Sequence, residues 1–301
     1  MKELLRKLFN KAGYDIIKTP LHSDSKAGTS VKVQVGNFPI YLPGNNPHIS
    51  TYTFRPDANN LLGILAAQVA PKYPDMHLID IGANVGDTAA VVKTNVDIPV
   101  IAIEGDPISF QYLERNTQQF RGMTLIKEFL GEEKQTIHVN LEKTGWNTTL
   151  IPTKNTGQEI SLKTLDEVLV EYKVMDVTIK VLKIDCEGFD TIILRGSGDL
   201  LLKHKPVLFF EYNRVNMDAI KEDGLSTLFA LERFGYKSVI FFDNYGRYML
   251  TTPISQHELI RELHYYSEDS ISQIGYFDVC LFHENDADIA KKFTQRVAGY
   301  K

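Results

Sequence analysis

A short glycine-containing turn is the stretch of the sequence best suited to hold a ligand. The apolar run Leu78-Ile79-Asp80-Ile81 leads into the turn Gly82-Ala83-Asn84-Val85-Gly86, and a helix start, Asp87-Thr88-Ala89-Ala90, follows. Glycine lets the backbone adopt positive φ values and approach a ligand closely, and a helix start offers free N–H groups. A second apolar run, 100–103, ends in Glu104, where a carboxylate can bind a ribose diol. This pattern predicts a nucleotide-type cofactor site.

The residues of the turn favour one cofactor over another. A dinucleotide fingerprint has the form Gly-x-Gly-x-x-Gly, but the three corresponding positions here are Gly82, Asn84 and Asp87. A carboxylate at the third position would repel a pyrophosphate, whereas Asp80 beside the turn suits a ligand that carries a cationic amine. S-adenosylmethionine has a ribose diol, an amine and no phosphate, and so fits better. The alternative is an ordinary tight turn that binds no ligand.

The overall composition is that of a globular protein without a general affinity for nucleic acid. The 301 residues are 43% apolar and 24% charged, and the net charge is −5, whereas a nucleic-acid binder presents a basic surface. We therefore expect no nucleic-acid partner, and a homo-oligomer stays open. Charges interrupt the apolar residues of 1–18, and the apolar stretch 61–70 is too short to span a bilayer. We expect a soluble, cytoplasmic protein without a transmembrane segment.

Strands alternate with helices from residue 58 onward, which predicts an α/β domain with a doubly wound, mostly parallel sheet. Residues 1–57 are expected to form an N-terminal appendage, with an amphipathic helix over 2–11 and a hairpin that turns at Gly36-Asn37. Residues 58–301 would form the main domain. Four expected strands end in polar tips, at 80–87, 104–106, 185–188 and 211–213. Ligands bind at the carboxyl ends of such strands, so these tips are expected to surround one site.

Carboxylates at these tips are the candidates for chemistry. If the cofactor is S-adenosylmethionine, the reaction needs alignment of the reactants and a group that takes a proton from the acceptor. Asp185 and Glu187, followed by Glu211, are the candidates for that group. Alternatively, the three carboxylates bind Mg²⁺ together with the acceptor, or the first two only cap a helix. The histidines, His48 among them, show no partner spacing and are expected to be structural or exposed. The acceptor pocket is expected to include Trp146, Asn147, Tyr212 and Asn213.

Four blocks of the sequence, in family order over about residues 75–213, resemble the FkbM-type methyltransferases. The blocks are Asp80–Gly86, similar to the motif DxGANxG; 162–166, similar to the element TLD; Lys183–Phe189, similar to KIDVEG; and 206–211, similar to a strand of the form P-x-hydrophobic-Glu. The resemblance implies an S-adenosylmethionine-dependent methyltransferase of class I, with a seven-stranded Rossmann-like sheet. It also implies O-methylation of a sugar, glycan or related metabolite.

The resemblance also implies which residues contact the cofactor. They are Asp80, Gly82, Asn84 and Gly86 at the methionine part, Glu104 at the ribose, and Glu128 and Phe129 near the adenine. Cys186, Asp190 and Ser197 depart from the family pattern, beside the cofactor turn rather than in it. Two other functions are compatible with the same strand, turn and helix. One is a nicotinamide-dependent oxidoreductase, and the other is a non-catalytic module that binds S-adenosylmethionine.

Overall fold

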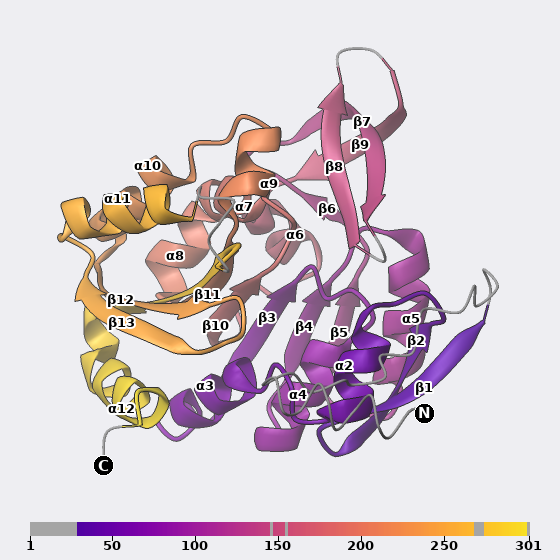
Figure 1. Cartoon of the computed structure of the whole chain (residues 1–301), viewed down its shortest axis with the longest axis horizontal. Coiled ribbons are helices and arrows are strands. Elements are labelled where there is room, and N and C mark those ends of the chain that lie inside the picture. The colour runs from indigo at the N-terminus through magenta and orange to yellow at the C-terminus, as the bar shows by residue number, and fades with distance from the viewer. Residues whose placement is uncertain (1–28, 145–146, 154–155, 268–273, 300–301) are drawn as a thin grey trace, which may run out of the picture.

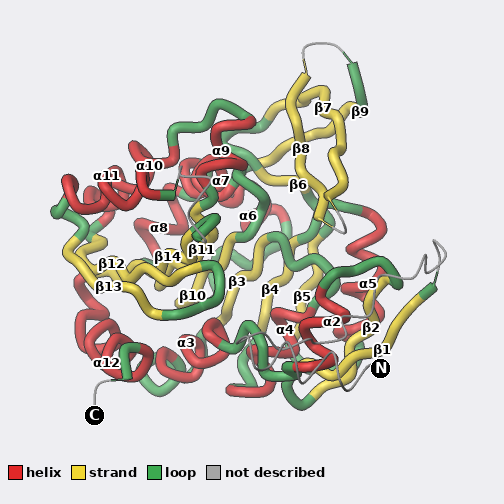
Figure 2. The backbone as a smooth tube through the Cα atoms, viewed as in Figure 1, coloured by secondary structure: helices red, strands yellow, loops and turns green. Residues whose placement is uncertain are grey.

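The computed structural model describes residues 29–144, 147–153, 156–267 and 274–299, with the side chains of 141–150 left out (Figures 1 and 2). The central sheet is built from β3 (His77–Ile81), β4 (Val100–Ile103), β5 (Met123–Ile126), β10 (Ile179–Ile184), β11 (Val207–Tyr212), β12 (Tyr236–Asp243), β13 (Tyr248–Pro253) and β14 (Phe277–His283). Its strand order is β13-β12-β14-β11-β10-β3-β4-β5. Two smaller sheets are β1 (Ser30–Val35) with β2 (Phe38–Pro43), and the sheet β6-β9-β7-β8. In the latter, β6 is Phe129–Leu130, β7 is Gln135–Thr144, β8 is Asn147–Thr153 and β9 is Gln158–Lys163.

The central sheet is mostly parallel, as the sequence predicts. Strands β5, β4, β3, β10 and β11 pair in parallel, and β14 lies antiparallel between β11 and β12. The sheet has eight described strands rather than the expected seven, because β13 forms an antiparallel hairpin with β12 at one edge. The Asp243 carboxylate stabilises the hairpin turn by accepting hydrogen bonds from the backbone N–H groups of Tyr245 and Arg247. Strands β5 and β6 are close in sequence but belong to different sheets.

Helices cover both faces of the central sheet. The described α-helices are α2 (His48–Phe54), α3 (Leu61–Val69), α4 (Asp87–Asn95), α5 (Pro107–Thr117), α6 (Leu165–Glu171), α7 (Asp190–Arg195), α8 (Gly198–His204), α9 (Arg214–Ala219), α10 (Gly224–Ala230), α11 (His257–Tyr266) and α12 (Ala287–Val297). Figure 1 shows α3, α4 and α12 on one side, and α7, α8 and α10 on the other. Successive strand residues face opposite sides. Leu78 accordingly packs with α3, α4 and α12, whereas Ile79 packs with α6, α7, α8 and α10.

The N-terminal hairpin packs against the edge of the main domain. Strands β1 and β2 pair around Gly36-Asn37, which confirms the expected hairpin. Asn116 of α5 accepts a hydrogen bond from the backbone N–H of Tyr41 and donates to the carbonyl groups of Tyr41 and Val85. The helix expected over 2–11 lies outside the described residues, and the domain boundary at residue 57 stays a prediction. No helix in the described part of the chain is long and apolar enough to cross a membrane.

Candidate active site

A cavity of about 730 Å³ lies at the carboxyl ends of β3, β4, β10 and β11. Each of the four polar tips identified in the sequence contributes lining residues, namely Gly82, Glu104, Asp185 and Glu211 among others. Helix α2 and the turn between β12 and β13 complete the wall. The volume is in the range of cavities that bind cofactors and small substrates. The tips meet because the carboxyl ends of parallel strands lie at one edge of a sheet.

The turn after β3 presents its backbone to this cavity. Gly82, Asn84 and Gly86 have φ values of 69°, 46° and 84°, so the turn alternates through the left-handed region that glycine and asparagine tolerate. A Cβ atom on Gly82 would lie 1.9 Å from the carbonyl oxygen of Asp185, so only glycine fits against the loop after β10. Helix α4 begins at Asp87, directly after the turn. Its N-terminal end is therefore beside the cavity.

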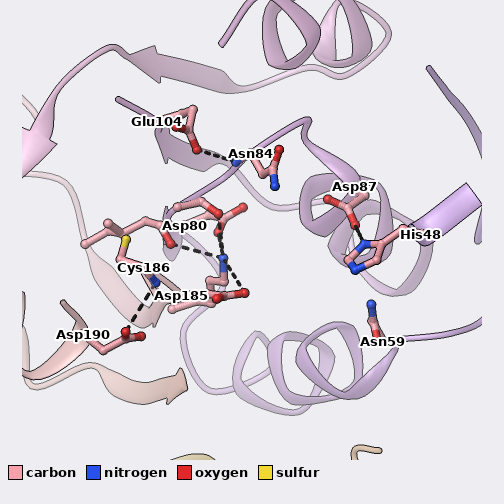
Figure 3. Close-up of polar contacts among 12 residues, drawn as sticks. His48, Asn59, Asp80, Asn84, Asp87, Glu104, Asp185, Cys186 and Asp190 are labelled. Carbon is pink, nitrogen blue, oxygen red and sulfur yellow. Dashed lines mark hydrogen bonds and ion pairs between the residues drawn. The ribbon is translucent and has the colours of Figure 1, made fainter. Parts of the chain in front are cut away.

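Glu104 is held at the end of β4 by the neighbouring backbone. Its two carboxylate oxygens accept hydrogen bonds from the N–H of Asn84 (2.8 Å) and the N–H of Asp106 (2.7 Å), and Figure 3 shows Glu104 beside Asn84. Burial raises the pKa of Glu104 to about 7, although the two N–H donors act in the opposite direction. Each oxygen keeps a further lone pair. The fixed carboxylate is thus able to accept hydrogen bonds from a diol.

Phe129 and Glu128 lie at the neighbouring part of the cavity wall. The Phe129 ring packs directly on Gly105, where a Cβ atom would lie 2.3 Å from a ring carbon. The Glu128 carboxylate is 2.8 Å from the ammonium group of Lys163. An apolar ring beside the Glu104 loop suits the stacking of a flat base.

The loop after β10 and the end of β11 bring carboxyl groups to the cavity. Asp185, Glu187 and Glu211 all line it. Glu187 has a φ of 51° and accepts a hydrogen bond from the side-chain amide of Asn216 (2.8 Å). Burial raises the pKa of Glu211 well above its usual value, and the charge of Asp185 adds to this effect. The sequence correctly places these three residues near one another, while their catalytic roles stay predictions.

The sequence analysis did not assign to the site Asp190, which contacts the loop after β10, or Asp278. Asp190 of α7 accepts hydrogen bonds from the backbone N–H groups of Cys186 and Gly188, and burial raises its pKa to about 8. Asp278 of β14 lines the cavity, and burial raises its pKa to about 7. The sequence signal for Asp278 is weak, because β14 is antiparallel and presents its beginning rather than its end to the site.

Residues 80–238, more than half of the chain, match the family model of the methyltransferase FkbM domain. The chain belongs to the FkbM methyltransferase family. A solved FkbM methyltransferase from Methylobacillus flagellatus KT is 20% identical with a TM-score of 0.38, over 55% of this chain and 40% of that one. The present chain thus spans less than half the length of that relative. A comparison with curated proteins finds no match.

Other solved methyltransferases are similar at lower identity. Precorrin-6y C5,15-methyltransferase from Geobacter metallireducens GS-15 is 13% identical, over 74% of this chain and 88% of that one, with a TM-score of 0.38. The plantazolicin methyltransferase BpumL, solved with SAH, is 8% identical over 77% of this chain and 88% of that one, with a TM-score of 0.39. The mostly parallel central sheet of this FkbM methyltransferase, with β14 reversed, is the class I methyltransferase architecture that the sequence predicts.

The family implies S-adenosylmethionine as cofactor, and the residues of the turn fit it, with two changes from expectation. Asp80 does not line the cavity: it is fully buried, 2.8 Å from the ammonium group of Lys183. Gly86 is likewise behind the wall, where it precedes α4. Asp87 is the carboxylate beside the turn that does line the cavity. We therefore expect Asp87, rather than Asp80, to face the amine of the cofactor.

Asp87 has two partners from α2, which the sequence analysis did not connect with the site. The Tyr52 hydroxyl donates a hydrogen bond to the Asp87 carboxylate (2.6 Å), and His48 Nδ1 lies 3.8 Å from the same oxygen. Figure 3 shows His48 directed at Asp87. Burial alone would raise the pKa of Asp87, but hydrogen bonding to His48 and Tyr52 outweighs it and lowers that pKa. Asp87 is thus ionised at neutral pH. The sequence analysis missed its contact with His48 because no spacing pattern links the two residues.

Two of the four expected acceptor residues, Tyr212 and Asn213, do not line the cavity. Strand residues alternate, so Glu211 faces the cavity while Tyr212 is buried with its hydroxyl 2.7 Å from His264 Nδ1. Asn213 caps α9 by accepting a hydrogen bond from the N–H of Asn216. Trp146 lies outside the described residues. Asn147 begins β8, and its side chain also lies outside them.

The alternative of a magnesium site finds no support in the described part of the chain. No group of three or more His, Cys, Asp or Glu side chains there is arranged to hold a metal ion. Asp185 instead lies 3.9 Å from the Lys183 ammonium group, and Glu211 accepts a hydrogen bond from the side-chain amide of Asn213 (3.1 Å). Each of the three carboxyl groups therefore has a protein partner of its own, since Asn216 donates a hydrogen bond to Glu187.

Proposed function

We propose that this methyltransferase transfers a methyl group from S-adenosylmethionine to a hydroxyl group of a sugar, glycan or related metabolite. The observation that carries the proposal is one cavity in which carboxyl groups from β10, β11 and β14 adjoin the cofactor turn of β3. Carboxylates accept hydrogen bonds from hydroxyl groups strongly. A carboxylate whose pKa is near neutrality can also take the hydroxyl proton.

The charge of the cavity wall supports a neutral acceptor. The basic side chains among its lining residues are Arg55, Lys183 and His48, of which Lys183 pairs with Asp80 and His48 with Asp87. Acidic lining residues are far more numerous: Asp57, Asp87, Glu104, Asp106, Glu128, Asp185, Glu187, Glu211 and Asp278. A phosphate-rich acceptor would be repelled by this wall, and nucleic acid would gain little from release of its counterions. The net charge of −5 supports the same conclusion.

The residues of the chain would bind and orient both reactants. Glu104 would accept hydrogen bonds from the ribose hydroxyl groups, Phe129 would pack against the adenine, and Asp87 would pair with the amine. When bound, S-adenosylmethionine supplies an electrophilic methyl group on a positively charged sulfur. Asp185, Glu187 and Glu211 would hold the acceptor hydroxyl in line with that methyl group, since alignment supplies most of the rate in such displacements.

Radiolabelled methyl transfer into fractions of source cells tests the proposal. We expect label from methyl-labelled S-adenosylmethionine in a saccharide or glycolipid fraction with the parent protein, and far less with Glu104→Ala. The matched control is Glu258→Ala, which removes an 88% exposed carboxylate on α11. Label in RNA, DNA or protein would contradict the acceptor class. Cofactor binding without label in any fraction would favour a non-catalytic module, and binding of NAD instead would favour an oxidoreductase.

The cellular setting follows from the same proposal. We propose that the enzyme acts in the cytoplasm on a small-molecule or glycan acceptor, without a nucleic-acid partner. Fractionation of source cells, with the protein followed by an antibody, tests the location. Recovery of the protein with the membrane fraction would contradict it.

A further inference from the structure

Strand β14 brings a carboxyl group to the cavity from outside the segment that matches the family model. The match ends at residue 238, and Asp278 is the second residue of β14. Because β14 is antiparallel to β11, it begins at the edge of the sheet where β10 and β11 end. Asp278 lies directly opposite Glu211 in the register of these two strands, and both residues line the cavity.

The neighbours of Asp278 show which way the strand faces. Phe277 and Val279 pack in the core shared with α10 and α11, whereas Cys280 packs in the core on the opposite face. Asp278 therefore lies on the same face of the sheet as Cys280, but closer to the carboxyl ends of β10 and β11. Its side chain is half-buried and faces the cavity rather than either core.

The carboxyl oxygens of Asp278 are free to receive a hydrogen bond. Within the described ranges, no protein donor contacts them. Two other carboxyl groups of the cavity differ in this respect, because Asn213 donates to Glu211 and Asn216 donates to Glu187. Asp278 is thus the better acceptor for a hydroxyl group that enters the cavity.

The surroundings of Asp278 bring its pKa close to neutral pH, as a general base requires. Burial and then the charge of Asp185 raise the pKa of Asp278 to about 7, while Lys183 acts in the opposite direction. The other titratable groups that face it are Glu211 of β11, Asp243 of β12 and Tyr276 just before β14. A general base works best when its pKa is close to the working pH.

We propose that Asp278 takes the proton of the acceptor hydroxyl during methyl transfer. This role rests on the proposed function above. The acceptor oxygen forms a bond to the methyl carbon as the carbon–sulfur bond breaks with its electron pair left on sulfur. The hydroxyl proton passes to the Asp278 carboxylate. A sulfonium and a carboxylate are thereby replaced by a neutral thioether and a neutral acid, which suits a site shielded from water.

Calorimetry with two ligands tests this placement without a known acceptor. S-adenosylmethionine carries a positive sulfur and favours the ionised form of Asp278, whereas S-adenosylhomocysteine does not. Titrations in buffers of different ionisation enthalpy should show more proton release with the former at pH 7. Asp278→Asn should reduce this difference by up to about half a proton, because a group with a pKa near 7 is half ionised there. Asp176→Asn, at a 96% exposed carboxylate, should leave it unchanged.

The outcomes separate the two proposals. An unchanged difference in Asp278→Asn would overturn the role of Asp278. Failure of the parent protein to bind S-adenosylmethionine would instead overturn the proposed function.

Methyl transfer into a crude saccharide extract provides the second test. Asp278→Asn should lower kcat by about 10², with little change in KM, and should remove the acidic limb of the pH profile near pH 7. Asp278→Glu should keep that limb and restore part of the rate. Transfer by Asp278→Asn at the parent rate across the pH range would overturn the role. If Asp278→Asn does not fold, Asp278→Glu decides: a rate below that of the parent supports the role, and transfer at the full parent rate contradicts it.

Discussion

The ammonium group of Lys183 lies 2.8 Å from a carboxylate oxygen of Asp80, and both side chains are buried directly behind the cofactor turn. The same ammonium group donates hydrogen bonds to the carbonyl oxygens of Ile81 and Gly82. Lys183 lies on β10 and Asp80 on β3, so the pair ties the two central strands together where they end. The family motifs at these two strands therefore form one buried ionic unit.

Removing one partner of this unit should destabilise the fold. Lys183→Met leaves the Asp80 carboxylate buried without a counter-charge, which typically costs about 3–5 kcal/mol. Urea unfolding of the purified protein measures the change. The double variant Asp80→Asn with Lys183→Met should recover part of the loss, because no charge remains to be buried. A single-variant loss below about 1 kcal/mol would show that the pair is not important for stability.

Glu104 should control cofactor affinity. Glu104→Ala should weaken S-adenosylmethionine binding at least tenfold, about 1.4 kcal/mol, through loss of the ribose hydrogen bonds. Because the pKa of Glu104 is about 7 before binding, affinity for S-adenosylhomocysteine should rise between pH 6 and pH 8 in the parent. Glu104→Gln should flatten this rise. Calorimetry at both pH values measures it, and parent-like affinity in a folded Glu104→Ala protein would remove the ribose assignment.

Asp185 should affect the rate and its pH dependence together. Asp185→Asn should leave cofactor affinity nearly unchanged while methyl transfer falls by about 10². The Asp185 charge raises the pKa of Asp278, so its removal should also move the acidic limb of the pH profile to lower pH. Rate measurements at saturating saccharide extract test both effects. Loss of activity on chelation, with recovery on Mg²⁺, would instead assign this carboxylate to a metal site.

The stability of the protein should fall as the pH rises toward 8. Burial raises the pKa of Asp190 to about 8 in the folded state, whereas an Asp in the unfolded chain titrates at about pH 4. Between these two pH values, Asp190 is protonated in the folded state and ionised in the unfolded state. Stability therefore decreases with pH by about 1.4 kcal/mol per unit for this group until the pH passes the folded-state pKa. Asp190→Asn should flatten the slope between pH 5 and pH 8 in urea unfolding. Asp176→Asn, at an exposed carboxylate, should not.

The position of Gly82 and Glu104 at one cavity was predictable because both residues follow strands in sequence. Glycine spacing and an acidic residue after the next apolar run are local patterns, and parallel pairing brings Gly82 and Glu104 to one edge. The sequence also indicated that Asp185 and Glu211 would reach the same edge, for the same reason. The prediction that Asp80 faces the cofactor was wrong. Its partner Lys183 lies about a hundred residues later in the sequence, and no local pattern links the two residues.

The rest of the site depends on contacts between distant elements. Asp278 begins an antiparallel strand, so a search of strand ends does not find it. His48 contacts Asp87 from α2, a helix that precedes the main domain in the sequence. Tyr212 was assigned to the pocket because it follows Glu211, but adjacent strand residues face opposite sides. The eighth strand depends on a turn that Asp243 stabilises with its side chain.

The contact between Gly82 and the Asp185 carbonyl limits how the proposed methyltransferase can be altered. With no room for even one added carbon between the two loops, a shift of the 185–188 loop toward a differently shaped acceptor would displace the cofactor turn as well. A change of acceptor is therefore best sought in parts of the wall that do not touch the turn after β3. The tip of the β12–β13 hairpin, at Asn244, Tyr245 and Gly246, is such a part. It is the natural place for a library of variants with new acceptor preferences.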